Sequence, residues 1–434
     1  MCFQNLKVFI SKQSKSTGTG KTMAVSETFC VLPWLHLHFW PDGKVHHCCL
    51  GSSNYPMGHL EQGSPNTLIN NERYKKLRLQ LLNNEKPKSC LQCFERENHG
   101  AVSMRQHHNE VWAKEIPHVL ENTDHTGFVK DFKFKYWDFR FSNLCNMKCR
   151  MCGTTFSSQW FDDEVKLSEK GLRGKPSTTK RVNNSQDTSS VDLKSWVESK
   201  IDEVEYCYFA GGEPLIMEEH YYILKKLIDA KRTDVRIRYN TNLLKLNFKG
   251  YDLVDMWNQF DYVEINASID DIGERAEYIR AGTKWNDIEQ NLQRLQDTNV
   301  VLLIECTTQA MNVLTVPDLY KRLAEIGIPP YKIRLHNLLQ QPKSFTVKIL
   351  DDNLKQLAEE KFANYLNSID TKHKEEVAPW FQTIVDYMYD INDDERYKLQ
   401  KQFKVQQNAI DDIRNENFVD VFPHLKEWYN AIPV

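Results

Sequence analysis

The sequence predicts an α/β protein whose central part is a parallel sheet curled into a partial (β/α)6 barrel of the TIM type. Two observations predict this fold. Six strand-like segments recur along the chain, and amphipathic helical patterns separate most of them. Strands that alternate with helices pair in parallel, because each helix carries the chain back over the sheet. The expected strands are residues 135–142, 204–210, 235–242, 262–269, 300–306 and 331–337, and the clearest helices are residues 220–231, 285–296 and 317–327.

Segments of different composition flank the predicted barrel. A polar N-terminal tail is typical of disorder, a small domain rich in cysteine, histidine and tryptophan follows it, and the chain ends in a helical extension with aromatic anchors. The predicted division is a tail at 1–24, the cysteine-rich domain at 25–112, a connector at 113–134, the barrel at 135–340 and the C-terminal extension at 341–434. Within the barrel, residues 171–190 are expected to form a polar surface loop.

The tail contains Gly18-Thr19-Gly20-Lys21-Thr22, which ends like a phosphate-binding loop. That motif requires another glycine five positions before Gly20, where this chain has Lys15. We therefore expect no nucleotide site in the tail, and Met23 is an alternative start of the protein.

Composition argues against several classes of partner. The 434 residues are 26% charged with a net charge of −3, whereas nucleic-acid and membrane-surface binding favour a basic excess. The sequence shows no apolar run of membrane-spanning length and no secretory signal core, so we expect a cytoplasmic protein. Eight of its eleven cysteines fall between Cys30 and Cys152. In a reducing compartment such clusters indicate metal ligation and not a disulfide framework.

Three of these cysteines form a tight group directly after the first predicted barrel strand. Cys145, Cys149 and Cys152 have the spacing C-x3-C-x2-C, in the kind of loop where barrels place their chemistry. A closed zinc site would use four ligands, and c-type haem attachment would need a histidine where Gly153 stands. Three thiolates on a [4Fe–4S] cluster would leave one iron open to an outside ligand.

This loop resembles the signature of the radical S-adenosylmethionine (SAM) enzymes, and the resemblance extends over residues 135–340. It implies that Cys145, Cys149 and Cys152 hold the catalytic cluster. Gly211-Gly212-Glu213 resembles the family's GGE motif, which receives the SAM ammonium group. The resemblance implies further contacts with SAM from Asn242, Ser268 and Arg280, the last to the carboxylate. One departure is Met151, where the family commonly has an aromatic residue.

The N-terminal cysteines form a second set. Cys30, Gly43 and Cys48, followed by Cys90 and Cys93, resemble the auxiliary-cluster domains called SPASM and Twitch, although such domains usually follow the barrel. The single-cluster Twitch form implies that Cys30, Cys48, Cys90 and Cys93 hold a second [4Fe–4S] cluster. The same four residues also suit a zinc site, and Cys49 could replace Cys48 as a ligand.

The function expected from the resemblance is that of a radical SAM enzyme. It would reductively cleave SAM to a 5′-deoxyadenosyl radical, which abstracts a hydrogen from a peptide, protein or small-molecule substrate, and the auxiliary cluster would handle an electron. Ferredoxin or flavodoxin would donate the reducing electron. The alternative is a non-catalytic zinc- or iron–sulfur-binding protein that transfers electrons or binds a partner. The sequence does not identify the substrate.

Overall fold

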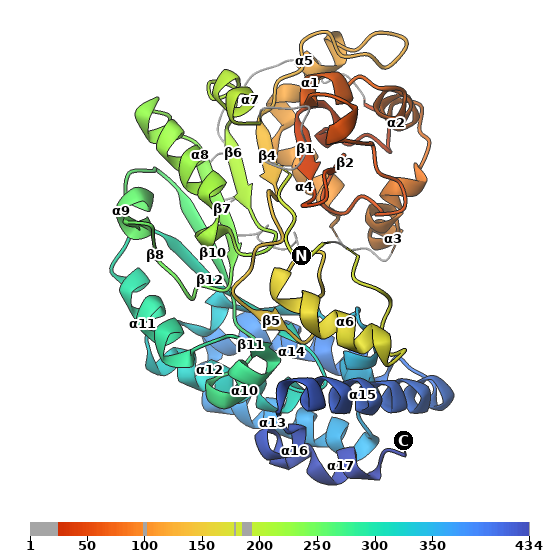
Figure 1. Ribbon diagram of the computed structural model, residues 1–434, viewed down its shortest axis with the longest axis vertical. Coiled ribbons are helices and arrows are strands. Elements are labelled where there is room, and N and C mark those ends of the chain that lie inside the picture. Colours follow the sequence, from red (N-terminus) through yellow and green to blue (C-terminus); the bar gives the residue numbers. More distant parts are fainter. Residues whose placement is uncertain (1–24, 99–101, 178, 185–192, 434) are drawn as a thin grey trace. The chain divides into compact units, whose positions relative to one another are not determined.

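The computed structural model describes residues 25–433 apart from 99–101, 178 and 185–192 (Figure 1). The expectations for residues 1–24 lie outside this part of the chain. The chain divides into two compact units. The first unit comprises Met1–Ser142, Asn183–Gly211 and Tyr221–Arg236, and the second comprises Asn143–Val182, Gly212–His220 and Ile237–Val434. The division predicted from composition stays a prediction.

The first unit is built on strands that run in the order β6-β4-β1-β2-β3. Strand β1 pairs in parallel with β4, and β4 in parallel with β6, whereas β1, β2 and β3 pair antiparallel. Every residue of β1 and β4 is buried, as expected of strands covered on both faces. The strands are β1 (His36–Phe39), β2 (Lys44–His46), β3 (Gly58–His59), β4 (Tyr136–Phe139) and β6 (Tyr206–Phe209).

Side chains cap several helices of the first unit. Asn71 caps α2 by accepting from the Tyr74 amide, and Ser103 forms a capping box with Gln106 at the start of α4. These caps order a region in which the sequence shows few long periodic segments. The helices are α1 (Pro65–Leu68), α2 (Glu72–Leu82), α3 (Leu91–Asn98), α4 (Met104–Val111), α5 (Ile116–Glu121), α7 (Leu193–Ser199) and most of α8 (Glu218–Asp229).

The second unit contains four parallel strands in the order β13-β12-β10-β7. These strands are β7 (Arg236–Thr241), β10 (Val263–Ser268), β12 (Val301–Thr308) and β13 (Ile333–Leu338). Four very short strands form two further antiparallel pairs: β5 (Lys148–Cys149) with β11 (Arg280–Ala281), and β8 (Asn247–Phe248) with β9 (Tyr251–Asp252).

Helices of the second unit follow the strands and then form the C-terminal region. The first group is α6 (Phe161–Glu169), α9 (Leu253–Trp257), α10 (Gly273–Ile279), α11 (Trp285–Gln296) and α12 (Val316–Glu325). The C-terminal group is α13 (Asp352–Ser368), α14 (Thr371–Tyr389), α15 (Asp393–Arg414), α16 (Phe418–Val421) and α17 (Lys426–Ala431). Helix α15 lies along α6 and also contacts α16 (Figure 1).

The predicted fold class is confirmed. All six expected strands are present, as β4, β6, β7, β10, β12 and β13, and the three expected helices are α8, α11 and α12. The parallel strands with intervening helices are consistent with a partial TIM barrel, and the C-terminal region is helical. None of the helices in the described ranges is both long and apolar enough to span a membrane.

Candidate functional site

The three-cysteine loop follows β4 and is held along its backbone. Strand β5 within the loop pairs antiparallel with β11, so that Cys149 lies opposite Arg280. The indole of Trp160 donates to the Cys149 carbonyl at 2.7 Å, and the Ser157 hydroxyl donates to the Met147 carbonyl at 2.6 Å. These contacts fix the loop before any cofactor binds.

The three thiols of this loop lie close enough to affect one another. Burial raises the pKa of Cys145 well above its usual value, and the neighbouring Cys149 raises it further. Burial and Cys149 likewise raise the pKa of Cys152 to about 12. The pKa of Cys149 is also raised, chiefly by burial, although Arg280 opposes this shift. The thiols are therefore protonated in the free chain, and binding of iron would release their protons.

The GGE segment packs directly on this loop. A Cβ atom placed on Gly212 would lie 2.1 Å from the Leu144 carbonyl oxygen, so only glycine fits there. The amide of Glu213 donates to the same carbonyl at 2.8 Å. The close approach thus places Glu213 beside the first cysteine of the loop.

The Glu213 carboxylate is buried and accepts three hydrogen bonds. Oε1 accepts from the Thr241 hydroxyl at 2.6 Å and from the Leu215 amide at 3.1 Å, and Oε2 accepts from the Asn242 amide at 2.8 Å. Burial nevertheless raises the pKa of Glu213 to about 7. Since a carboxylate has about four acceptor positions, one on Oε2 is left for a further donor such as an ammonium group.

Asn242 joins the same arrangement from the end of β7. Its Nδ2 donates to Oδ1 of Asn146, which lies between the first two cysteines, at 2.7 Å. The Nδ2 of Asn146 is buried and meets no partner among the described residues. An unpaired buried donor beside the loop fits a site that a polar ligand completes.

Arg280 also reaches the loop, but its guanidinium is already paired. Nε and Nη2 contact the Asp270 carboxylate at 2.7 and 3.0 Å, and Nη1 lies 3.7 Å from the Cys149 sulfur. Ser268 ends β10 opposite Glu305 and is half-buried. No contact described for these residues joins Ser268 to the cysteine loop. Glu213, Asn242 and Arg280 therefore contact the cysteine loop, whereas no such contact is seen for Ser268 in the described residues.

Arg150, which no sequence motif singles out, anchors this loop to the C-terminal helices. Arg150 is fully buried, its guanidinium lies over the Tyr278 ring at 3.5 Å, and it donates to Gln407, Asp411 and Glu416. These partners lie more than 250 residues away along the chain, so no local sequence pattern predicts the contacts.

A second contact joins the loop to α15. The Asp163 carboxylate of α6 forms ion pairs with Nζ of Lys148 in the loop, at 3.0 Å, and with Nε of Arg414 in α15, at 2.8 Å. The C-terminal helices are therefore part of the frame of the site.

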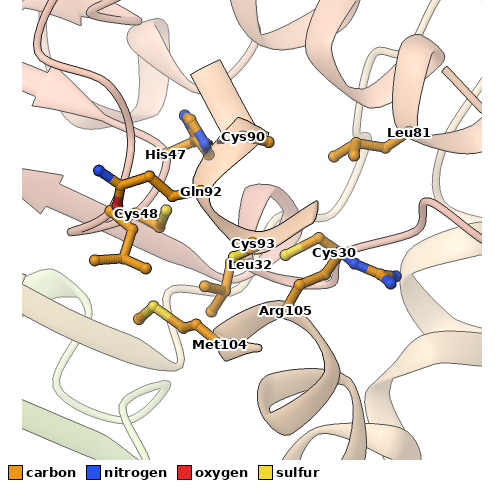
Figure 2. Close-up of a pocket in the computed structure, with 11 residues that line it drawn as sticks. Cys30, Leu32, His47, Cys48, Leu81, Cys90, Gln92, Cys93, Met104 and Arg105 are labelled. Atoms are coloured by element: carbon orange, nitrogen blue, oxygen red, sulfur yellow. Dashed lines mark hydrogen bonds between the residues drawn. The ribbon is translucent and has the colours of Figure 1, made fainter. Parts of the chain in front are cut away.

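The second cysteine set lines one pocket in the first unit (Figure 2). Cys30, Cys48, Cys90 and Cys93 all face it, together with apolar side chains that include Leu32, Leu50, Leu81 and Met104. Burial is the main cause of the raised pKa of each thiol, to about 12 for Cys90. Neighbouring thiols add to the shifts of Cys30, Cys48 and Cys90. An all-thiol donor set within an apolar pocket fits an iron–sulfur cluster.

Cys49 does not line this pocket, and its sulfur lies 3.8 Å from that of Met104. Within the described part of the chain, no three His, Cys, Asp or Glu side chains are grouped as they would be around a single metal ion.

Histidines near this pocket differ in their surroundings. His38 contacts Asp138 through Nδ1 at 2.8 Å, and His36 contacts the Tyr136 carbonyl at 3.0 Å, both within the sheet of the first unit. His47, in contrast, lines the cysteine pocket, and its Nε2 lies 3.2 Å from the Cys90 sulfur.

Several solved structures resemble parts of the chain at low identity. The native anSMEcpe with bound AdoMet is 17% identical over 53% of this chain and 60% of its own, with a TM-score of 0.34. Streptococcus suis SuiB bound to S-adenosylmethionine is 12% identical over 68% of this chain and 63% of its own, also with a TM-score of 0.34. The chain thus spans less than two thirds of these proteins, and likenesses at such TM-scores do not bear on its function. No curated protein matches the chain.

Two family models match the chain. The radical SAM superfamily model matches residues 139–325, which contain the three-cysteine loop and the GGE segment. The SPASM model, an iron–sulfur cluster-binding domain, matches residues 30–94, which contain the second cysteine set. The expected cofactors are therefore confirmed: a [4Fe–4S] cluster with SAM for the first domain, and an auxiliary iron–sulfur cluster for the second. The chain carries a radical SAM domain and a SPASM domain.

Proposed function

We propose that this protein is a radical SAM enzyme that abstracts a hydrogen atom from its substrate and uses the auxiliary cluster to handle an electron. The observation that carries the proposal is the gathering of Glu213 and Asn242 on the loop of Cys145, Cys149 and Cys152. When bound, the cluster and SAM supply the reductive cleavage of SAM to methionine and a 5′-deoxyadenosyl radical.

The chain's own residues would position these groups. Cys145, Cys149 and Cys152 supply three thiolates and leave the fourth ligand position open. Glu213 accepts the SAM ammonium group at its remaining acceptor position, and Gly211, Gly212 and Asn242 shape that side of the site.

Arg280, which pairs with Cys149 across β11 and β5, would contact the SAM carboxylate. Asp270 accepts from Nε and Nη2, and Nη1 lies 3.7 Å from the Cys149 sulfur, so the N–H groups left on Nη1 and Nη2 would reach the SAM carboxylate. Ser268, at the end of β10, is proposed to contact the ribose or carboxylate of SAM.

Anaerobic reconstitution with iron and sulfide, followed by dithionite and SAM, tests the proposal. We expect 5′-deoxyadenosine to form, and we expect Glu213→Ala to reduce its formation while the iron content stays unchanged. A loaded protein that forms no 5′-deoxyadenosine would reject the proposal.

Metal analysis tests the rival interpretation of the cysteines as zinc ligands. Two four-iron clusters predict about eight irons and eight sulfides per chain. Replacing Cys145, Cys149 and Cys152 by alanine should leave about four irons, and replacing the N-terminal four should leave the other four. Two zincs per chain and no visible absorption would favour the non-catalytic protein.

The substrate class and electron donor belong to the same proposal. A peptide, a protein or a small molecule could be the substrate, and ferredoxin or flavodoxin could supply the electron. A reducing cytoplasm is the proposed location, because free thiols must persist until the clusters form.

A further inference from the structure

His47 lies beside a proposed ligand of the auxiliary cluster. It directly precedes Cys48 in the chain, lines the same pocket, and places Nε2 at 3.2 Å from the Cys90 sulfur (Figure 2). Most other side chains of the pocket wall are apolar. Burial of His47 is nearly complete, at 1% exposure, so water does not compete for this contact.

A thiolate at Cys90 would favour the tautomer of His47 that carries its proton on Nε2. The other ring nitrogen, Nδ1, is buried and meets no hydrogen-bond partner among the described residues, so no acceptor there would favour a proton on Nδ1. A Cβ atom on Gly51 would lie 3.0 Å from Cε1 of His47, which shows how closely the ring fits against the backbone. A thiolate sulfur can only accept, and a neutral imidazole with its proton on Nε2 can donate to it.

Three other polar side chains lie near the cysteines: Ser89, Gln92 and Arg105. The hydroxyl of Ser89 is 3.7 Å from the Cys90 sulfur, a longer contact. Arg105 lines the pocket, but its guanidinium pairs with Glu97 at 2.7 Å and donates to the Phe29 carbonyl at 2.7 Å. Of the side-chain hydrogen bonds to the sulfurs of this set in the described residues, that of His47 is the shorter one.

We propose that His47 donates a hydrogen bond from Nε2 to the thiolate of Cys90 and thereby raises the reduction potential of the auxiliary cluster. Reduction adds negative charge to a cluster, and a donor aimed at a ligand sulfur stabilises the more negative state. The hydrogen bond would thus favour acceptance of an electron by this cluster. The inference rests on the proposed assignment of Cys30, Cys48, Cys90 and Cys93 as its ligands.

The test uses the full chain with Cys145, Cys149 and Cys152 replaced by alanine, so that only the auxiliary cluster forms. An EPR-monitored redox titration of this parent is compared with the same protein carrying His47→Leu or His47→Gln. We expect His47→Leu to lower the midpoint potential by about 59 mV, which is a tenfold change in the ratio of oxidised to reduced cluster for one electron. His47→Gln keeps an N–H at similar reach and should restore most of the loss.

His36→Leu is the matched control, since His36 is equally buried but does not line the pocket. It should leave the potential unchanged. An equal potential in the parent and His47→Leu would overturn the proposal, as would an equal shift in His36→Leu.

If His47→Leu does not hold the cluster, nitrogen-15 labelling of histidine decides the matter. The parent should show a weak coupling between the reduced cluster and a histidine nitrogen, and this coupling should vanish in His47→Gln. Strong coupling would make His47 a direct ligand, and persistence in His47→Gln would exclude the contact; either result overturns the proposal. Failure of the ligand assignment looks different, because the parent itself would then contain no cluster.

Discussion

Glu213 is a carboxylate whose three hydrogen bonds do not offset the cost of its burial. Its pKa rises from 4.5 to about 7, so between these values the folded chain binds more protons than the unfolded chain. The free energy of unfolding of the SAM-free protein should therefore fall as the pH rises through this window. A bound ammonium group would lower the pKa of Glu213 again, because it stabilises the ionised carboxylate.

The first prediction follows from this charge state. SAM affinity should increase as the pH rises through about 7, where Glu213 ionises. Glu213→Gln should abolish this pH dependence and weaken binding by about 10- to 100-fold, the value of a hydrogen bond to a charged group. Equilibrium binding of SAM to the loaded protein at pH 6 and pH 8 measures both effects. An unchanged pH profile in Glu213→Gln would show that another group titrates.

The second prediction concerns Gly212. Its replacement by alanine forces a Cβ atom to 2.1 Å from the Leu144 carbonyl oxygen, so the GGE segment must move away from the cysteine loop. We expect Gly212→Ala to destabilise the fold by about 1–3 kcal/mol and to reduce SAM cleavage strongly. The control is Gly174→Ala, because nothing lies within 4 Å of a Cβ atom there. Chemical denaturation and 5′-deoxyadenosine formation distinguish the two variants, and equal behaviour would contradict the close approach.

At the scale of elements, α15 holds the cysteine loop through a buried ion pair. Arg150 contacts Asp411 and Glu416 of this C-terminal region, and Arg414 of α15 joins Asp163. Removing one partner of a buried pair leaves a charge without compensation inside the protein, which is far more costly than losing an exposed pair.

The third prediction tests this connection. Arg150→Leu should lower the free energy of unfolding by about 3–5 kcal/mol, because Asp411 is left buried without its partner. The iron bound by the three-cysteine loop should fall as well. Arg396, at the start of α15, forms ion pairs with the exposed Asp352 and Asp393. Arg396→Ala should therefore lower the free energy of unfolding by only about 0–1 kcal/mol. Equal losses in the two variants would mean that the burial of Arg150 is not what stabilises the loop.

At the scale of the whole molecule, both cysteine sets link cofactor loading to pH. The pKa of both Cys90 and Cys152 rises from 9.0 to about 12, so the folded apo-protein keeps protons that the unfolded chain loses above pH 9. Its stability should therefore fall as the pH rises from about 9 to 12. Clusters held by the proposed ligands would remove this dependence, because the ligating thiolates would already be deprotonated.

The fourth prediction compares the loaded and iron-free proteins. The difference between their thermal unfolding midpoints should be larger at pH 10 than at pH 7, since only the iron-free protein loses the stability of its protonated thiols. Buried tyrosines titrate in both forms and cancel in the comparison. A difference that stays constant with pH would show that the thiols are not coupled to folding.

Much of the fold could be predicted from the sequence because it depends on local patterns. Each of the six strands and three helices was visible in the spacing of apolar residues, and α11 has the bounds expected for it. The short pair of β5 with β11 could not be predicted, because a two-residue strand has no periodicity to detect.

The sequence alone predicts the chemistry of the site: the cysteines proposed as ligands, their spacing within each set, and the motif that carries Glu213. The tertiary structure alone decided how these residues are held. It placed Gly212 against Leu144, paired Arg280 with Asp270, and brought Arg150 to α15 and His47 to Cys90. The physical reason is that ligand spacing is a local property of the chain. The contacts that fix a ligand's charge and position join segments far apart in sequence, and only folding brings those segments together.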